Sequence, residues 1–187
     1  MRHRLIDMTG GQTVLSGAIP GRKLLSALIA ATRSSETPIP AFLDFDRVEV
    51  ATASFLREAV IGFRDYARQA LPNVYPVVAN LLPAVTEELD FFVRARGDAL
   101  WSCELDGNDG VVSARLIGEL DPAQRSTFEA VIELGAITAP ELAVRFPSQG
   151  IGATAWNNRL SALATKGLLV ERKQGKSKSF SPLLEIA

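Results

Sequence analysis

Apolar residues in the first 120 positions follow two different spacings. Residues 41–45 and 74–81 are short, mainly apolar runs, which are typical of buried strands. Residues 21–32, 52–70 and 83–96 instead carry apolar side chains at helical intervals. Because strands alternate with helices, we predict an α/β (α+β) domain with a mixed sheet covered by helices.

Two pairs of runs are separated by turn-forming residues and predict hairpins. Residues 4–8 and 12–16 flank Gly10-Gly11, and residues 100–105 and 111–116 flank Asp106-Gly107-Asn108-Asp109-Gly110. Glycine, asparagine and aspartate tolerate the positive φ angles that tight hairpin turns require. We therefore expect each pair to form two adjacent antiparallel strands.

The pattern changes after Asp121-Pro122, where we place the boundary between a domain of residues 1–120 and one of residues 121–187. Asp121 can cap a helix with Pro122 at its first position. Thr138 and Glu141 form the spacing of a capping box. The second domain is predicted to be mostly helical, with helices at 121–134, 138–146 and 152–165 and a hairpin of residues 168–173 and 178–184.

The helix at 152–165 has one apolar and one polar face. Trp156, Leu160 and Leu163 fall on one stripe, which we expect to be buried. Amides and hydroxyls of the opposite face can read base edges in the major groove, with an arginine beside them for guanine or phosphate. The predicted DNA-binding residues of this helix are Thr154, Asn157, Asn158, Arg159 and Ser161. The hairpin adds the phosphate-binding candidates Arg172, Lys173, Lys176 and Lys178.

Residues 139–180 resemble bacterial winged helix-turn-helix regulators. The resemblance rests on Glu141-Leu-Ala143, Thr154-Ala-Trp-Asn-Asn-Arg-Leu160, Lys166-Gly-Leu-Leu169 and Arg172-Lys-Gln-Gly-Lys176. It implies that the third helix enters the major groove of double-stranded DNA and that the hairpin, the wing, touches the neighbouring backbone. Many such regulators are homodimers. The alternative is a winged helix used for protein contacts, since a fold alone does not give a function.

Residues 10–96 resemble the STAS domain of anti-sigma-factor antagonists, and more closely a STAS-like family of unknown function. The matching residues are Phe42-Leu-Asp-Phe-Asp46, Val48-Glu-Val50, Thr52-Ala-Ser-Phe-Leu56, Ser16-Gly17 and Gly21-Arg22-Lys23. In the antagonists a serine at the position of Ser54 is phosphorylated, and the added charge disrupts a partner interface. Thr52 and Phe55 here replace the aspartate and glycine of that pattern. The interpretation we favour is therefore that Thr52 or Ser54 only caps the helix.

Charge and composition narrow the function classes. The net charge is −1, but the last 67 residues hold 8 Lys/Arg against 6 Asp/Glu, and residues 151–187 hold 6 against 2. A basic end favours nucleic acid or an acidic partner. Single Cys103 permits no internal disulfide, and apolar stretches are too short to cross a membrane, so we expect a cytoplasmic protein without membrane contact.

Nothing in the sequence has the pattern of a catalytic, cofactor or metal site. Asp44 and Asp46 share a strand face without a histidine or a phosphate-binding loop beside them. We therefore expect no enzyme, no cofactor and no metal. The first hypothesis is a DNA-binding transcriptional regulator or adaptor with a STAS-like sensing or partner-binding domain. Its rival is a partner-switching protein that binds a histidine-kinase-like ATPase or an anti-sigma-type partner.

Overall fold

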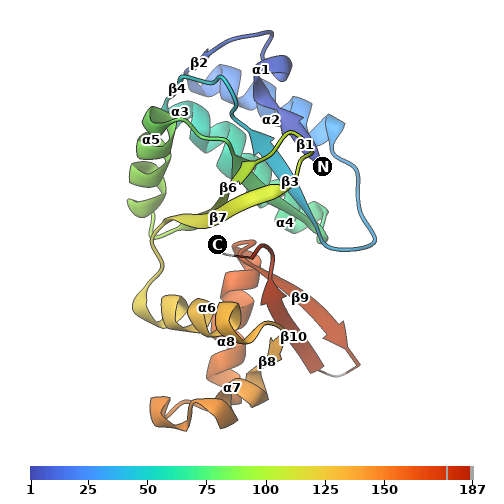
Figure 1. Ribbon diagram of the computed structural model, residues 1–187, viewed down its shortest axis with the longest axis vertical. Helices are drawn as coiled ribbons and strands as arrows, with labels where there is room; N and C mark the ends of the chain where they lie inside the picture. Colours follow the sequence, from blue (N-terminus) through green and yellow to red (C-terminus); the bar gives the residue numbers. More distant parts are fainter. Residues whose placement is uncertain (176, 186–187) are drawn as a thin grey trace. The chain divides into compact units, whose positions relative to one another are not determined.

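The computed structural model describes residues 1–175 and 177–185 (Figure 1). The chain divides into two compact units, Met1–Glu119 and a second that begins at Leu120. This division lies one residue before the boundary expected from Asp121-Pro122. No helix of the described residues is both long and apolar enough to cross a membrane.

The N-terminal unit is a mixed α/β fold. Its elements in chain order are β1 (Arg2–Arg4), α1 (Leu5–Met8), β2 (Val14–Leu15), α2 (Ala18–Ala31), β3 (Ile39–Asp44), β4 (Val50–Ala51), α3 (Ala53–Leu56), the π-helical turn η1 (Arg57–Ile61), α4 (Gly62–Ala70), β5 (Val74–Ala79), α5 (Pro83–Arg94), β6 (Ala99–Leu105) and β7 (Val111–Gly118). A five-stranded sheet has the order β1-β3-β5-β6-β7, in which only the β6–β7 pair is antiparallel. The mixed sheet and the β6–β7 hairpin are confirmed.

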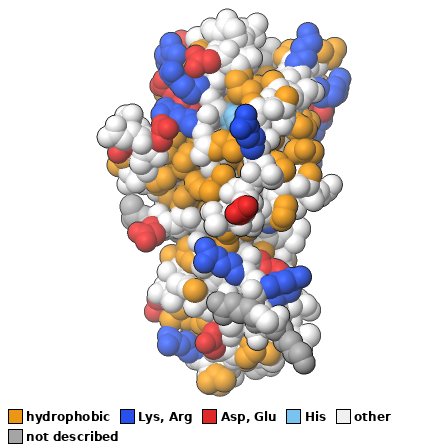
Figure 2. All heavy atoms as spheres, turned by 90° about the vertical axis from the view of Figure 1, so that its right-hand side faces the viewer, with side chains coloured by type: hydrophobic (Ala, Val, Ile, Leu, Met, Phe, Trp, Pro, Cys, Tyr) orange, Lys and Arg blue, Asp and Glu red, His pale blue; other side chains and the backbone are white. Residues whose placement is uncertain are grey.

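The surface of the molecule carries charges of both signs. On the face shown in Figure 2, Lys and Arg side chains lie interspersed with Asp and Glu rather than gathered into one region of a single sign.

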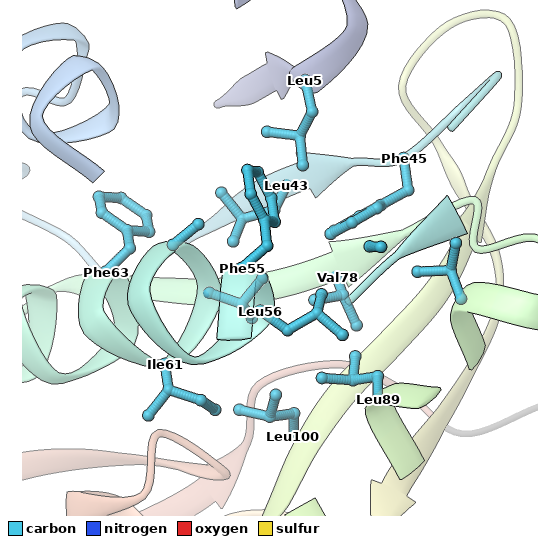
Figure 3. Close-up of a cluster of buried hydrophobic side chains, with 14 of the residues drawn as sticks. Leu5, Leu43, Phe45, Phe55, Leu56, Ile61, Phe63, Val78, Leu89 and Leu100 are labelled. Atoms are coloured by element: carbon cyan, nitrogen blue, oxygen red, sulfur yellow. The ribbon is translucent and has the colours of Figure 1, made fainter. Parts of the chain in front are cut away.

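One face of the sheet packs against helices in a single core. Leu43 and Val78 from the strands and Phe45, which follows β3, meet Phe55 and Phe63 from the long helix 53–70 (Figure 3). Apolar side chains at helical intervals along this helix are buried, as expected from the sequence: Phe55, Leu56, Ala59, Val60, Phe63 and Ala67. The helix is continuous from Ala53 to Ala70 but contains the π turn η1.

Helix α2 approaches the long helix closely because of a glycine. A Cβ atom on Gly21 would lie 2.9 Å from the carbonyl oxygen of Phe55 and 2.9 Å from the Cβ of Glu58. Any side chain at position 21 would push the two helices apart. The close packing therefore depends on Gly21.

The hairpin predicted for residues 4–8 and 12–16 is wrong. Arg2–Arg4 is a strand, but it pairs in parallel with β3, and Leu5–Met8 is a short helix. Val14–Leu15 pairs in parallel with β4. Gly10 and Gly11 do have positive φ angles of 70° and 81°, but they end a helix instead of joining two strands. Long-range pairing with β3 and β4 overrides the local turn signal.

The C-terminal unit combines three helices with a small antiparallel sheet. Its elements are α6 (Pro122–Leu134), β8 (Ile137–Thr138), α7 (Ala139–Arg145), the 3₁₀ turn η2 (Pro147–Gln149), α8 (Ala153–Thr165), β9 (Leu169–Gln174) and β10 (Ser177–Pro182). The strand order is β8-β10-β9. The three predicted helices and the hairpin are confirmed, whereas the short strand β8 was not predicted.

Local signals fix the helix ends of this unit. Asp121 Oδ1 accepts a hydrogen bond of 2.8 Å from the amide of Gln124. Thr138 and Glu141 form the complete capping box, with the Thr138 amide donating to Glu141 Oε2 at 2.7 Å. These bonds satisfy amides that the first turn leaves without helical partners. Both predicted caps are confirmed.

Candidate nucleic-acid interface

Helix α8 buries one face within its unit and exposes the other. Trp156, Leu160 and Leu163 are fully buried, and the helix packs on α6, α7 and β9 (Figure 1). On the opposite side Thr154 and Asn158 are exposed, and Asn157 and Ser161 are partly exposed. Four of the predicted residues thus share one accessible face, as the helical period requires.

Two alanines belong to the same surface. Ala155 and Ala162 are partly exposed and flank Asn158 and Ser161 on the helix. Because an alanine side chain has no donor or acceptor, these two positions were not predicted as DNA-binding residues. Their position follows from the same helical period, so the signal was present. Small side chains here let another molecule approach the helix closely.

Arg159 does not lie on the accessible face with the other predicted residues. Its guanidinium carbon lies 5.5 Å from the centre of the Trp156 ring, in cation–π geometry, and the residue is only partly exposed. One residue of helix advances about 100°, which turns position 159 away from Asn158 and toward the buried stripe. The structure therefore separates Arg159 from the other predicted residues of α8.

The indole that Arg159 covers is a core side chain. Trp156 is fully buried and lies 6.0 Å from the Phe146 ring, centre to centre. Its Nε1 atom has no hydrogen-bond partner in the described part of the chain. Such a ring anchors α8 and cannot stack on a nucleic-acid base without leaving the core.

The β9–β10 hairpin presents several cations. Arg172 and Lys173 are exposed, and neither has an acidic partner among residues 1–175 and 177–185. Lys178 stands directly opposite Lys173, and its Nζ lies 2.9 Å from Glu171 Oε1. Like charges directly opposite each other weaken a strand pair, so the Lys173–Lys178 pair does not stabilise the hairpin. Lys176, also predicted to bind phosphate, lies outside the described residues.

The N-terminal candidate Ser54 lies in the first turn of the long helix, but the predicted cap is wrong. Neither Thr52 nor Ser54 makes a side-chain bond to the helix amides. Thr52 Oγ1 instead accepts a 3.2 Å bond from the Gly17 amide and lies 3.2 Å from Ser54 Oγ. The capping group comes from α5, where Glu88 Oε1 accepts a 2.9 Å bond from the amide of Ala53. The positive end of this helix thus already holds a carboxylate.

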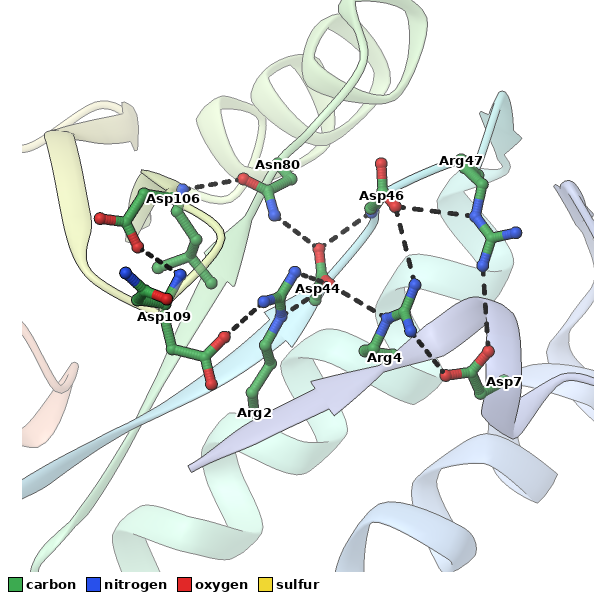
Figure 4. A network of polar contacts seen from close by, with 11 residues as sticks. Arg2, Arg4, Asp7, Asp44, Asp46, Arg47, Asn80, Asp106 and Asp109 are labelled. Carbon is green, nitrogen blue, oxygen red and sulfur yellow. Dashed lines mark hydrogen bonds and ion pairs between the residues drawn. The ribbon is translucent and has the colours of Figure 1, made fainter.

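A polar network that sequence reasoning missed lies where the parallel strands end (Figure 4). The fully buried Asp44 carboxylate accepts bonds of 2.9 and 2.8 Å from Arg2 and one of 2.8 Å from Asn80. The amide of Asp46 donates to the same group at 3.0 Å. Asp44 and Asn80 both stand at the carboxyl ends of neighbouring parallel strands, and this was the signal available in the sequence. With both oxygens engaged, Asp44 ties β1, β3 and β5 together.

The arginines around Asp44 also pair with more exposed acids. Arg2 contacts Asp109 in the β6–β7 turn, and Arg4 reaches Asp7 at 3.5 Å. Arg47 lies 3.6 Å from Asp46. Each of the three arginines is thus paired with at least one carboxylate.

Cys103 is a poor site for chemistry. It is buried in β6, and burial raises the pKa of its thiol to about 12, so it stays protonated near neutral pH. Across the described ranges no group of three or more His, Cys, Asp or Glu side chains is placed to hold a metal ion.

Comparisons with known proteins identify no relative. No protein-family model matches the chain, and no curated protein matches its sequence.

Proposed function

We propose that the C-terminal unit is a winged helix-turn-helix that binds double-stranded DNA, and that the protein is a transcriptional regulator or adaptor. The element order supports this proposal, because the strand order β8-β10-β9 and the helices α6, α7 and α8 match the arrangement of a winged helix. In this interpretation α7 and α8 are the helix-turn-helix, and the β9–β10 hairpin is the wing.

The observation that carries the proposal is the uncovered polar face of α8. Its own unit buries Trp156, Leu160 and Leu163 and leaves Thr154, Asn158 and Ser161 accessible. A recognition helix needs this division, since one face must hold the fold and the other must reach base edges. The cations Arg172 and Lys173 on the wing have no acidic partner in the described chain, which suits contacts to phosphates.

The N-terminal unit is proposed to be a STAS-like domain that receives a signal or binds a protein partner. Val14, Val50 and Ile19 are large apolar side chains that stay exposed near Ser54. Val14 and Val50 are register partners in the β2–β4 pair, and the Gly17–Thr52 bond joins this pair to the starts of α2 and the long helix. Exposed apolar residues grouped at one end are typical of a contact surface.

The test is DNA binding by the full chain, measured by fluorescence anisotropy with genomic fragments between 50 and 200 mM salt, roughly the range over which phosphate contacts lose strength. We expect salt-sensitive binding with a sequence preference. Lys173→Gln should weaken binding to every fragment alike and reduce the salt slope by about 1. The matched control is Lys23→Gln, which removes the same charge from an exposed site in the N-terminal unit.

The rival function is a partner-switching protein that binds a histidine-kinase-like ATPase and uses the winged helix for protein contacts. The exposed apolar residues near Ser54 favour it. Absence of salt-sensitive binding to any genomic fragment, together with capture of such an ATPase, would establish this rival and reject the DNA-binding proposal.

A further inference from the structure

The face of α8 centred on Asn158 carries no charged side chain, and the partly exposed Arg159 lies beside this face, toward Trp156. Thr154, Ala155, Asn158, Ser161 and Ala162 lie on the surface opposite the buried stripe, and all are small and neutral. We call this set the α8 strip. Its first three members lie in the N-terminal half of the helix, the part that contacts base edges in helix-turn-helix proteins.

The side chains of the strip match one type of base pair. In the major groove adenine offers N7 as acceptor and N6 as donor, which an asparagine amide can bind with two hydrogen bonds. Thymine offers a C5-methyl group, which alanine and the threonine methyl contact favourably. Asn158 lies between Ala155 and Ala162 along one side of the helix, so one strip holds a reader of adenine beside readers of thymine.

The side chains that would read the other base pair are missing from the strip. Guanine is read mainly by arginine or lysine, and cytosine by aspartate or glutamate. The helix does contain Arg159, but its guanidinium lies over the Trp156 ring at 5.5 Å, outside the strip. Lys166 follows the last turn of α8, at the opposite end from Thr154.

We propose that the α8 strip reads A·T base pairs in the major groove, with Asn158 bound to the N6 and N7 atoms of an adenine and Ala155 and Thr154 against thymine methyl groups. This inference rests on the proposed DNA binding and adds the base composition of the contacted site. The Lys173 and Arg172 contacts to phosphate supply affinity without sequence information.

The experiment begins with selection of bound duplexes from a random-sequence pool by the full chain, followed by sequencing. The selected duplex is then rebuilt with single 7-deazaadenine or uracil substitutions. The first removes the N7 acceptor of adenine and the second removes the thymine methyl, and both leave base pairing and the minor groove intact. We expect an A·T-rich core, a loss of about tenfold in affinity for 7-deazaadenine at one position, and about fourfold for uracil at a neighbouring position.

The variant Asn158→Ala tests whether Asn158 is the residue that contacts the N7 atom of the adenine. It should lower the affinity for the selected duplex and abolish the further effect of 7-deazaadenine, whereas Lys173→Gln should leave that effect at its full size. Circular dichroism of Asn158→Ala checks that the helix is intact, as expected for an exposed position.

The outcomes separate this inference from the function on which it rests. A G·C-rich core with salt-sensitive binding overturns the A·T inference and leaves DNA binding in place. An A·T-rich core that is insensitive to both modified bases places the readout in the minor groove or in DNA shape and also overturns it. A 7-deazaadenine effect that persists in Asn158→Ala overturns the role of that residue. Absence of binding to any duplex overturns both proposals.

Discussion

Several arginines of the N-terminal unit and two cations of the C-terminal hairpin are placed in opposite ways. In the N-terminal unit Arg2 binds the buried Asp44, Arg64 binds Asp98 at 2.6 Å, and Arg94 binds Asp90 at 2.6 Å. On the hairpin of the C-terminal unit, Arg172 and Lys173 point to solvent without an acidic partner in the described chain. Cations that are paired stabilise a fold, and cations that are left without partners remain available to an external anion. The same residue types therefore predict opposite responses to mutation.

The largest effect is expected at Asp44. Asp44→Ala removes the acceptor of Arg2, Asn80 and the Asp46 amide, so the free energy of unfolding should fall by about 3 kcal/mol, as when one partner of a buried ion pair is lost. Urea denaturation measures this change. The control Asp7→Ala breaks only exposed ion pairs and should cost less than about 0.5 kcal/mol. Equal effects of the two variants would show that the network does not hold the strands together.

The next largest effect is expected at Arg172 and Lys173, where substitution should change DNA binding but not the stability of the fold. Arg172→Ala combined with Lys173→Ala should leave the melting temperature unchanged or raise it slightly, since Lys173 stands opposite Lys178. The same pair of changes should reduce the salt slope of DNA binding by about 2, one for each phosphate contact. Anisotropy titrations at several salt concentrations give the slope. A clear drop in melting temperature would mean that these cations are structural, and the contrast with Arg2 would fail.

A smaller effect is expected where the helix end already holds an anion. Ser54→Asp places a second carboxylate beside Glu88, so it should lower the free energy of unfolding by about 0.5 kcal/mol instead of stabilising the helix. In a Glu88→Gln background the same substitution should be neutral or stabilising. Thermal melting of the two single variants and the double variant gives a double-mutant cycle for these two positions. Additive effects would indicate that Glu88 and position 54 do not interact.

The smallest effect concerns His3, which is buried in the N-terminal unit. Its Nε2 lies 3.1 Å from Thr32 Oγ1, and burial and the nearby N-terminal amine lower its pKa below the ordinary value of 6.5. The unfolded chain therefore takes up a proton before the folded one does, and stability should fall as the pH drops below about 6.5. His3→Gln keeps a donor near Nε2 but does not titrate. Its melting temperature should fall less between pH 7.5 and 5.5 than that of the wild type, about the range in which histidine titrates.

Signals that act over a few residues were the ones that could be predicted. The caps at Asp121 and Thr138 involve partners three residues away, and the turn Asp106–Gly110 lies between strands that pair with each other. The Trp156 stripe follows from the helical period alone. These features depend on little outside their own segment, so the sequence indicates them directly.

Features that depend on distant partners were missed. The acceptor for the Ala53 amide is Glu88, 35 residues away, and the side-chain partners of Asp44 are Arg2 in β1 and Asn80, which follows β5. The strand β1 pairs with β3, about 40 positions along the chain, and the local Gly10-Gly11 signal gave no hint of this. Arg159 lies over Trp156 and not in line with Asn158, because one residue advances a helix by about 100°.

The π turn in the long helix has a consequence for insertions and deletions. A π turn holds one residue more than the corresponding α-helical turn, so Arg57–Ile61 acts as a single-residue insertion within an otherwise regular helix. Deleting one residue there would restore regular geometry but rotate Ala53–Leu56 by about 100° relative to Phe63. Phe55 would leave the core, and the first turn would lose its contact with Glu88. The number of residues in this helix therefore sets which side chains face the core. A one-residue deletion should lower the stability of the fold more there than in the loop after α2.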